Sequence, residues 1–173
     1  MLTLACIVVI ICLSQAQTDR GRVLLGGSAS LNMPTNDNPQ RSYFQMQPRV
    51  GWFVADNAAI GAGVPVSIAK NGDNRSSSVG LAPFGRFYVG PSVVKLFFEG
   101  RFGIEHYTNR VKTGANETKT SDDAIFVGFG IGGAFFLNDH VALEPQLSYD
   151  AYSRDSPVSS AFNLNIGFQV YLP

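Results

Sequence analysis

The stretch KLFFEGRFGIEHY, residues 95–107, alternates between two kinds of side chain. One set is apolar or small and consists of Leu96, Phe98, Gly100, Phe102 and Ile104. The other set holds the charges and consists of Lys95, Phe97, Glu99, Arg101, Gly103, Glu105 and Tyr107. Because successive side chains of a strand point to opposite faces, this period of two predicts a β-strand with one greasy and one polar face.

The same alternation recurs along the chain, and helical spacing is found nowhere at comparable length. It predicts eight strands, at residues 22–31, 42–53, 58–69, 79–89, 95–108, 124–136, 141–153 and 160–172. Each is longer than a typical strand of a soluble sheet. Ten or eleven residues rising ~3.3 Å each, tilted near 45°, cover about 25 Å, the height of the apolar band of a transmembrane barrel.

Composition sets the outer limits. The chain has 173 residues, of which 45% are hydrophobic and only 15% charged, with a net charge of zero. The length suits one domain. The charge content is low for a water-exposed surface, and zero net charge gives no support to a nucleic-acid partner.

The first sixteen residues, MLTLACIVVIICLSQA, are typical of an export signal. An apolar run is followed by small residues before Ala16, which predicts cleavage between Ala16 and Gln17. Both cysteines, Cys6 and Cys12, lie inside this segment, so we expect no disulfide in the mature domain at residues 17–173. A membrane anchor is the alternative for this segment, although the run is short for a bilayer span.

One phrase is written nearly twice: GWFVADNAAIGAG at residues 51–63 and GAFFLNDHVALEP at residues 133–145. Each reads as strand, turn, strand, with Asp56-Asn57 and Asn138-Asp139 supplying the turn. These short turns alternate with long polar connections such as KNGDNRSSS and NRVKTGANETKTSDD. Short turns on one rim and long loops on the other predict an all-β, eight-stranded antiparallel up-and-down transmembrane β-barrel.

Aromatic residues gather near both ends of the predicted strands, where two belts would mark the membrane interfaces. On the short-turn side these are Trp52, Phe53, Phe87, Tyr88, Phe135, Phe136 and Tyr171. On the long-loop side they are Tyr43, Phe44, Tyr107, Tyr149, Tyr152 and Phe162.

The competing architecture is a soluble barrel with its apolar face inward around a ligand. The outward face of such a barrel would have to be solvent-exposed and rich in Lys and Glu. In this chain the second face is mostly small or uncharged, as with Gly61 and Gly63, and again with Gly128, Gly130 and Gly132. Such residues suit a crowded interior, so we favour the membrane barrel.

The mature chain resembles the small outer-membrane β-barrels, the OmpA/OmpX-like barrels that are often called a porin family. The two hairpins above, the opening VLLGGSASL and the closing NLNIGFQVYLP carry the resemblance. It implies a location in the outer membrane of a Gram-negative envelope, with the bilayer and the barrel-assembly machinery as partners. The residues that resemble the C-terminal assembly signal are Asn165, Gly167, Val170 and Leu172.

Strand parity also predicts what fills the barrel. The charged residues expected to face inward are Arg49, Arg86, Glu99, Arg101, Glu105 and Glu144, with Asp150 near the long-loop rim. Side chains just fill an eight-stranded barrel, so we expect these groups to form an ion-pair network that closes the lumen. A gated, small-conductance pore through exchanging pairs is the alternative; a wide channel needs about sixteen strands.

Other motifs are weaker. GFGIGG, residues 128–133, has dinucleotide-motif spacing but lies in a predicted strand with no helix after it. His106 and His140 look isolated, and a lipid-modifying enzyme would need one of them to meet a serine and an acid on the outer surface. We therefore expect a monomeric, non-enzymatic barrel without cofactor or metal, with a role in envelope integrity or in binding an extracellular ligand through its long loops.

Overall fold

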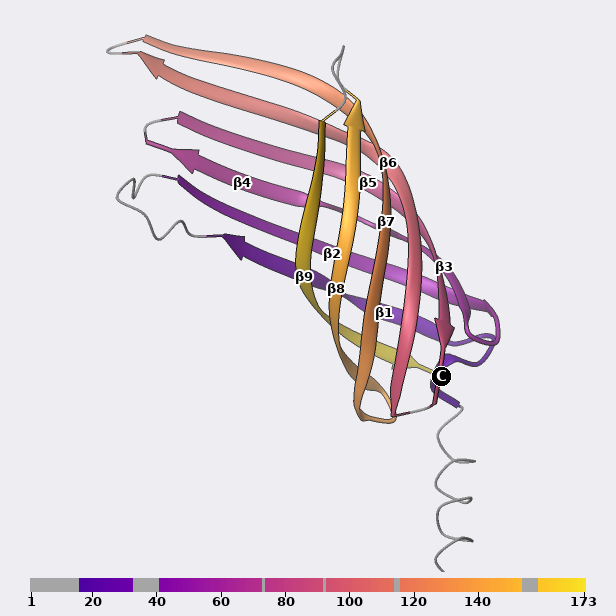
Figure 1. The fold of residues 1–173 in the computed structure, drawn as a ribbon. Helices are drawn as coiled ribbons and strands as arrows, with labels where there is room; N and C mark the ends of the chain where they lie inside the picture. The colour runs from indigo at the N-terminus through magenta and orange to yellow at the C-terminus, as the bar shows by residue number, and fades with distance from the viewer. Residues whose placement is uncertain (1–15, 33–40, 73, 92, 114–115, 154–158) are drawn as a thin grey trace, which may run out of the picture.

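The computed structural model describes residues 16–32, 41–72, 74–91, 93–113, 116–153 and 159–173. The elements are η1 (Ala16–Thr18), β1 (Val23–Asn32), β2 (Arg41–Ala55), β3 (Ala58–Gly63), β4 (Val66–Asn71), β5 (Asn74–Val89), β6 (Val94–Thr113), β7 (Asn116–Asn138), β8 (Val141–Ser153) and β9 (Ser159–Leu172). Neighbouring strands pair antiparallel, except that β3 and β4 do not pair with each other and both lie between β2 and β5; β1 pairs with β9 to close the ring (Figure 1). In this described part of the chain, no helix is long and apolar enough to cross a membrane.

The ring has eight walls although nine strand segments are numbered, because β3 and β4 form one wall interrupted at Val64 and Pro65. Arg49 pairs with Gly63 and Met46 with Val66, so the register on β2 continues through the interruption. Proline has no N–H to donate, which breaks the ladder locally without shifting it. Val64 N donates to Pro48 O at 2.9 Å within this stretch. The predicted eight-stranded barrel is confirmed.

The outer wall of the barrel is greasy. Large apolar side chains face outward on every wall, and among the most exposed are Phe129 (70%), Leu164 (72%) and Phe162 (73%). The opposite parity carries the buried charges, including Arg49 and Glu99. A continuous exposed apolar surface is unstable in water and stable in lipid, so this orientation is that of a membrane barrel. The soluble, inward-greasy alternative is wrong.

The predicted long loops after the third and fifth walls are mostly strand. The polar stretch 70–78 falls largely in β4 and β5, which pair up to Asn71 and Asn74. The stretch 109–123 continues β6 and β7, which pair up to Thr113 and Asn116. Polar groups pair across these extensions, as when Ser76 Oγ donates to Asn109 Oδ1 at 2.6 Å.

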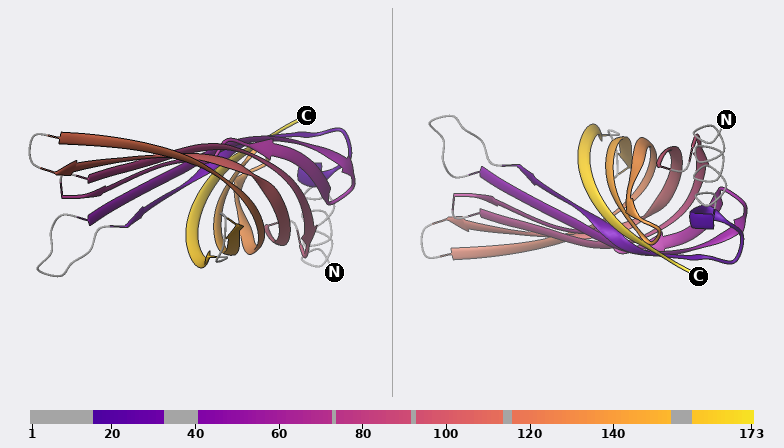
Figure 2. Two further views of the ribbon diagram at one scale, coloured as in Figure 1. Left: turned by 90° about the horizontal axis from the view of Figure 1, so that it is seen from above. Right: turned by 90° about the horizontal axis from the view of Figure 1, so that it is seen from below.

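These extensions give the molecule its shape. The far ends of the β1–β2, β4–β5 and β6–β7 hairpins project together to one side, past the ends of β8 and β9 (Figures 1 and 2). β6 and β7 are the longest strands, with 20 and 23 residues. Residues beyond the bilayer meet water on both faces, so alternation with apolar residues is no longer needed there.

The repeated phrase builds the same hairpin twice. In both copies the register shifts just before the turn, between Phe53 and Ala55 and between Phe136 and Asn138. Asn57 takes a positive φ of 63° in the first turn. In the second, His140 N donates to Asn138 Oδ1 at 2.9 Å. A bulge with Asn or Asp chemistry is a compact way to reverse two strands.

The segment that enters β1 covers the short turn between β2 and β3. Gln17 and Thr18 are buried, and Thr18 Oγ1 donates to Asn57 Oδ1 at 2.7 Å. Asn57 N donates back to Thr18 O at 2.8 Å. Of the predicted signal peptide, residues 1–15 lie outside the described part, and the Ala16–Gln17 cleavage site stays a prediction.

A pair of neighbouring residues tests the orientation of the wall. A spin label at Leu164 is expected to be accessible to oxygen dissolved in the bilayer, because this side chain is 72% exposed on the greasy face. A label at Asn163, one residue away on the other face, is expected to be shielded from it. Power-saturation EPR in vesicles measures the oxygen accessibility of both labels. The reverse result would show that the assignment of lipid-facing and inward-facing residues is wrong.

Candidate functional site

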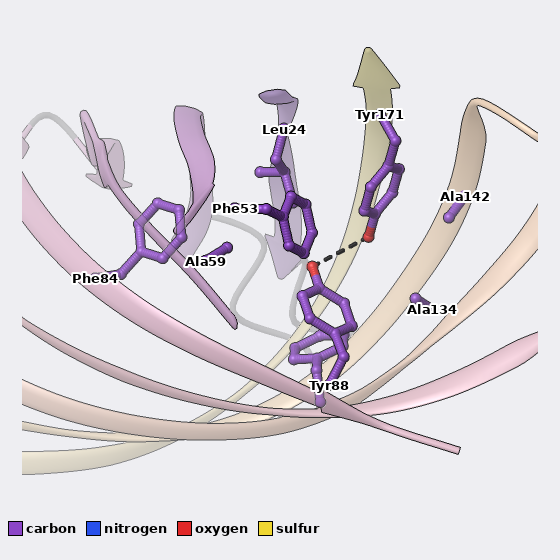
Figure 3. Packing of buried hydrophobic residues seen from close by; sticks show 9 residues of the cluster. Leu24, Phe53, Ala59, Phe84, Tyr88, Ala134, Ala142 and Tyr171 are labelled. Carbon is purple, nitrogen blue, oxygen red and sulfur yellow. Dashed lines mark hydrogen bonds between the residues drawn. The ribbon is translucent and has the colours of Figure 1, made fainter. Parts of the chain in front are cut away.

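An aromatic plug closes the interior at the short-turn end. Phe53, Tyr88, Phe97 and Tyr171 are each at most 2% exposed and belong to one cluster. Figure 3 shows Phe53, Tyr88 and Tyr171 together, and the Phe97 ring centroid lies 5.8 Å from that of Tyr88. The hydroxyls of Tyr88 and Tyr171 are 3.1 Å apart. The expected belt on this side is therefore partly wrong: Trp52, for example, faces lipid at 53% exposure, whereas Phe53 points inward.

Glu99 lies at the centre of the polar interior above this plug. Arg49 Nη1 donates to Glu99 Oε2 at 2.7 Å, and Arg86 Nη2 donates to the same oxygen at 2.7 Å. Arg101 Nη1 reaches Glu99 Oε1 at 3.5 Å, and Gln146 Nε2 donates to that oxygen at 3.2 Å. One buried carboxylate thus meets three guanidinium groups from β2, β5 and β6.

Arg86 joins this centre to the aromatic plug. Its Nη1 donates to Glu144 Oε2 at 2.6 Å and to Tyr88 Oη at 3.0 Å. Tyr171 Oη donates to the other Glu144 oxygen at 2.5 Å. The guanidinium also lies 4.0 Å from the centroid of the Phe97 ring, a favourable cation–π geometry.

A second pair lies nearer the long-hairpin side. Arg101 donates to both oxygens of Asp150, at 2.9 Å through Nε and 2.6 Å through Nη2. This fork is the strongest geometry available to an arginine and a carboxylate. Three arginines therefore balance Glu99, Glu144 and Asp150. Glu105 is also buried but lies apart from these groups, where it accepts from Ser78 Oγ at 3.1 Å.

The glycine-rich stretch of β7 makes room for this network. A Cβ at Gly128 would meet Asp150 Oδ1 and Arg101, and a Cβ at Gly130 would meet Gln146 Nε2. At Gly132 it would meet the Phe97 ring and Pro145 O. The GFGIGG motif thus has a packing reason: its wall approaches the filled interior closely.

The acidic side chains at the centre of the interior are fully paired. Each carboxylate oxygen of Glu99, Glu144 and Asp150 accepts at least one hydrogen bond. On the donor side, Arg49 Nε is buried without a hydrogen-bond partner. Ion pairs of this kind roughly balance their own desolvation, whereas removing one partner leaves a buried charge without compensation. The network also cross-links β2, β5, β6 and β8 from inside, which fixes their register.

His106 is not isolated, contrary to the sequence reading. Its Nδ1 lies 2.7 Å from Asp123 Oδ1 on the next strand, on the outer face near the long-hairpin end. His140 lies at a short turn, where its backbone N–H donates to Asn138 Oδ1. Among the described residues, no group of three or more His, Cys, Asp or Glu side chains could hold a metal ion.

The residues of the predicted assembly signal lie on the last strand. Asn165 is buried and donates to Ser148 Oγ at 3.4 Å. Gly167 pairs with Ser28, Val170 with Leu25, and Leu172 with Val23, across the closing seam. Recognition of these residues by an assembly machine stays a prediction.

A closed ring with a lipid-compatible wall, a charge-balanced interior and short turns on one rim defines an integral outer-membrane barrel. The sequence matches the outer membrane protein beta-barrel domain family over residues 2–169, and the chain belongs to that family. It therefore resides in the outer membrane, embedded in its bilayer. No curated protein matches the sequence.

Solved structures show the same fold at low identity. The N-terminal β-barrel domain of Pseudomonas aeruginosa OprF is 8% identical with a TM-score of 0.55, covering 89% of this chain and 98% of that one. Neisserial surface protein A is 13% identical with a TM-score of 0.57, covering 86% and 93%. Ail, the attachment invasion locus protein of Yersinia pestis, is 13% identical with a TM-score of 0.53, covering 87% and 99%.

Proposed function

We propose that this protein is a monomeric, non-enzymatic barrel whose interior is closed and whose task is to hold its projecting hairpins at the cell surface. The observation that carries the proposal is the filled lumen. Charge-paired side chains occupy its middle, and the plug of Phe53, Tyr88, Phe97 and Tyr171 closes the short-turn end. A barrel with a filled interior serves as a rigid membrane anchor, so we expect it to act by binding through its outer surfaces.

The surface best placed for contact is the projecting set of hairpins. The β6–β7 hairpin continues as a paired ladder to Thr113 and Asn116, which gives a firm arm in place of a flexible loop. Of the structural relatives, one is named a surface protein and one an attachment invasion locus protein. These names support a role in envelope structure or adhesion. Export through a cleaved signal peptide and insertion by the barrel-assembly machinery belong to the same proposal.

The closed lumen predicts electrical silence. The reconstituted barrel is expected to give no stepwise current in planar bilayers, while a wide porin prepared in the same way gives large steps. Discrete ion-selective steps that grow in Glu99→Gln would instead support the alternative of a charge-gated, small-conductance pore.

The hairpin role predicts a separable loss. Shortening the β6–β7 arm by removing 109–120 and closing it with a two-residue turn is expected to abolish attachment of expressing cells to their target surface. Heat-dependent gel mobility should be unchanged, because the removed pairs lie beyond the greasy wall. Shortening the 154–158 connection is the control. Undiminished attachment of the arm variant would contradict the role.

A lipid-modifying enzyme is the less supported alternative. His106 and Asp123 supply a base and its orienting acid on the outer face. Among the described residues, no serine or threonine hydroxyl bonds to His106, so the nucleophile that such chemistry needs is not in place.

A further inference from the structure

Four cations form one row across the outer face of the projecting hairpins. Lys70 pairs with Arg75, Arg75 with Arg110, and Arg110 with Lys119, so the row crosses β4, β5, β6 and β7. Residues paired directly across antiparallel strands point to the same side. All four side chains are exposed. Their parity is that of the lipid-facing residues below them.

Such a row is unfavourable by itself. Like charges directly opposite one another destabilise a sheet. Among the residues that the structure describes, the one ion pair made by this row joins Arg110 to Glu117, at 3.7 Å. Lys112 adds a further cation beside Glu117. Two hollows lie between these side chains. The charged residues that line the first, of about 330 Å³, are Lys70, Arg75, Arg110, Lys112 and Glu117, so four cations meet one acid there. The second, of about 180 Å³, is lined by Arg75, Arg110, Ser77 and Thr108. The arrangement fits a bound polyanion.

The rows beneath change in polarity toward the membrane. The next row on the same face is Ser77, Thr108 and Ser121, which offers hydroxyls. Below it lies a mainly apolar hollow of about 650 Å³, whose lining includes His106 and Asp123. Its greasy lining is Val79, Leu81, Ile104 and Ile125, each at least half exposed.

We propose that this strip of β4 to β7 binds a phosphorylated, acylated lipid of the outer leaflet. The acyl chain lies in the apolar hollow and the phosphate groups lie on the row of four cations. From Ile104 to Arg110 the strand advances about 20 Å at ~3.3 Å per residue, enough to run from the hydrocarbon edge past a lipid headgroup. Arginine pairs, with their forked donors, are well suited to phosphate oxygens.

The order of polarity favours a lipid over a protein partner. An acidic peptide would use the cations but leave the hollow below them unfilled, and that hollow opens on the greasy wall. A free phosphate could use the cations and the hydroxyls of Ser77 and Thr108, but it would leave the apolar hollow unfilled. The site is independent of whether the lumen conducts, so it stands or fails separately from the closed-barrel role.

The test uses the refolded full barrel in detergent micelles, with bisphosphorylated lipid A as the probe and binding followed by native mass spectrometry. Arg75→Gln/Arg110→Gln is expected to weaken binding about tenfold or more, since two charge-assisted phosphate contacts are lost. Arg20→Gln, an exposed cation at the short-turn rim, is the matched control and should bind as wild type. Dephosphorylated lipid A should bind wild type as weakly as the double variant binds the intact lipid.

The role of the apolar hollow is tested by placing a larger side chain in it. Ile125→Phe is expected to reduce binding several-fold by filling the hollow, while Ile166→Phe, on the greasy wall at a similar exposure of 60% against 64%, should have no effect. Inorganic phosphate at millimolar concentration should not displace the lipid. Equal binding by wild type and the arginine double variant would overturn the proposal, as would displacement by phosphate alone or equal binding of dephosphorylated lipid.

Discussion

Replacing Glu99 by glutamine is expected to lower the free energy of unfolding of the barrel by about 3–5 kcal/mol, the usual cost of removing one partner from a buried charge cluster. Arg49, Arg86 and Arg101 all contact this carboxylate. In the variant, three guanidinium groups would share only Glu144 and Asp150, in an interior where water is nearly excluded. The loss is therefore larger than that of an ordinary ion pair.

Urea unfolding in lipid vesicles measures this effect, and the single tryptophan of the chain, Trp52, reports the transition. Glu117→Gln removes an exposed acid 3.7 Å from Arg110 and is expected to change stability by at most about 1 kcal/mol. The double variant Arg49→Gln/Glu99→Gln restores the charge balance and should recover part of the loss. A Glu99→Gln barrel as stable as Glu117→Gln would show that the cluster does not hold the walls together.

Replacing Tyr171 by alanine is expected to cost about 3–5 kcal/mol, the range found when a large buried ring is truncated. The Tyr171 ring is fully buried, and its centroid lies 5.0 Å from the Phe136 ring centroid and 6.0 Å from that of Phe53. Its hydroxyl donates to Glu144, so Tyr171→Phe should cost about 1–3 kcal/mol by leaving that buried oxygen without its donor.

Tyr149→Phe is the control for the hydroxyl, since Tyr149 lies on the lipid-facing side at 40% exposure. We expect it to change stability by less than about 0.5 kcal/mol, as is usual for a surface position. Comparable losses for Tyr149→Phe and Tyr171→Phe would argue that the aromatic plug contributes nothing specific to closure.

Strand parity accounts for what the sequence could predict. Once residues 95–107 are taken as a strand, the backbone forces Glu99 and Arg101 to one side and Phe98 and Phe102 to the other. The same rule could have placed Phe53 inside, because it shares the parity of Arg49. Phe53 was assigned to the membrane-interface belt because it lies near a strand end. The alternation of the strand already indicated that its side chain points inward.

The long hairpins were harder to foresee because their signal disappears outside the bilayer. A strand with water on both faces has no need of alternating apolar residues, so 109–123 reads as loop. The pairing of His106 with Asp123 depends on that misread segment, since both belong to one register that continues to the pair Thr113 and Asn116. Distant partners such as Arg101 and Asp150 depend on barrel geometry, which no local pattern encodes.

The joint between the first and last strands has a mechanical consequence. It comprises seven residue pairs, from Val23–Leu172 to Ala29–Ile166, whereas β6 and β7 share twenty. The strand pair with the fewest paired residues is the easiest to separate, so lateral opening of the barrel toward neighbouring lipids would begin between β1 and β9. The long β6–β7 pair would stay intact while the barrel opens at the β1–β9 pair.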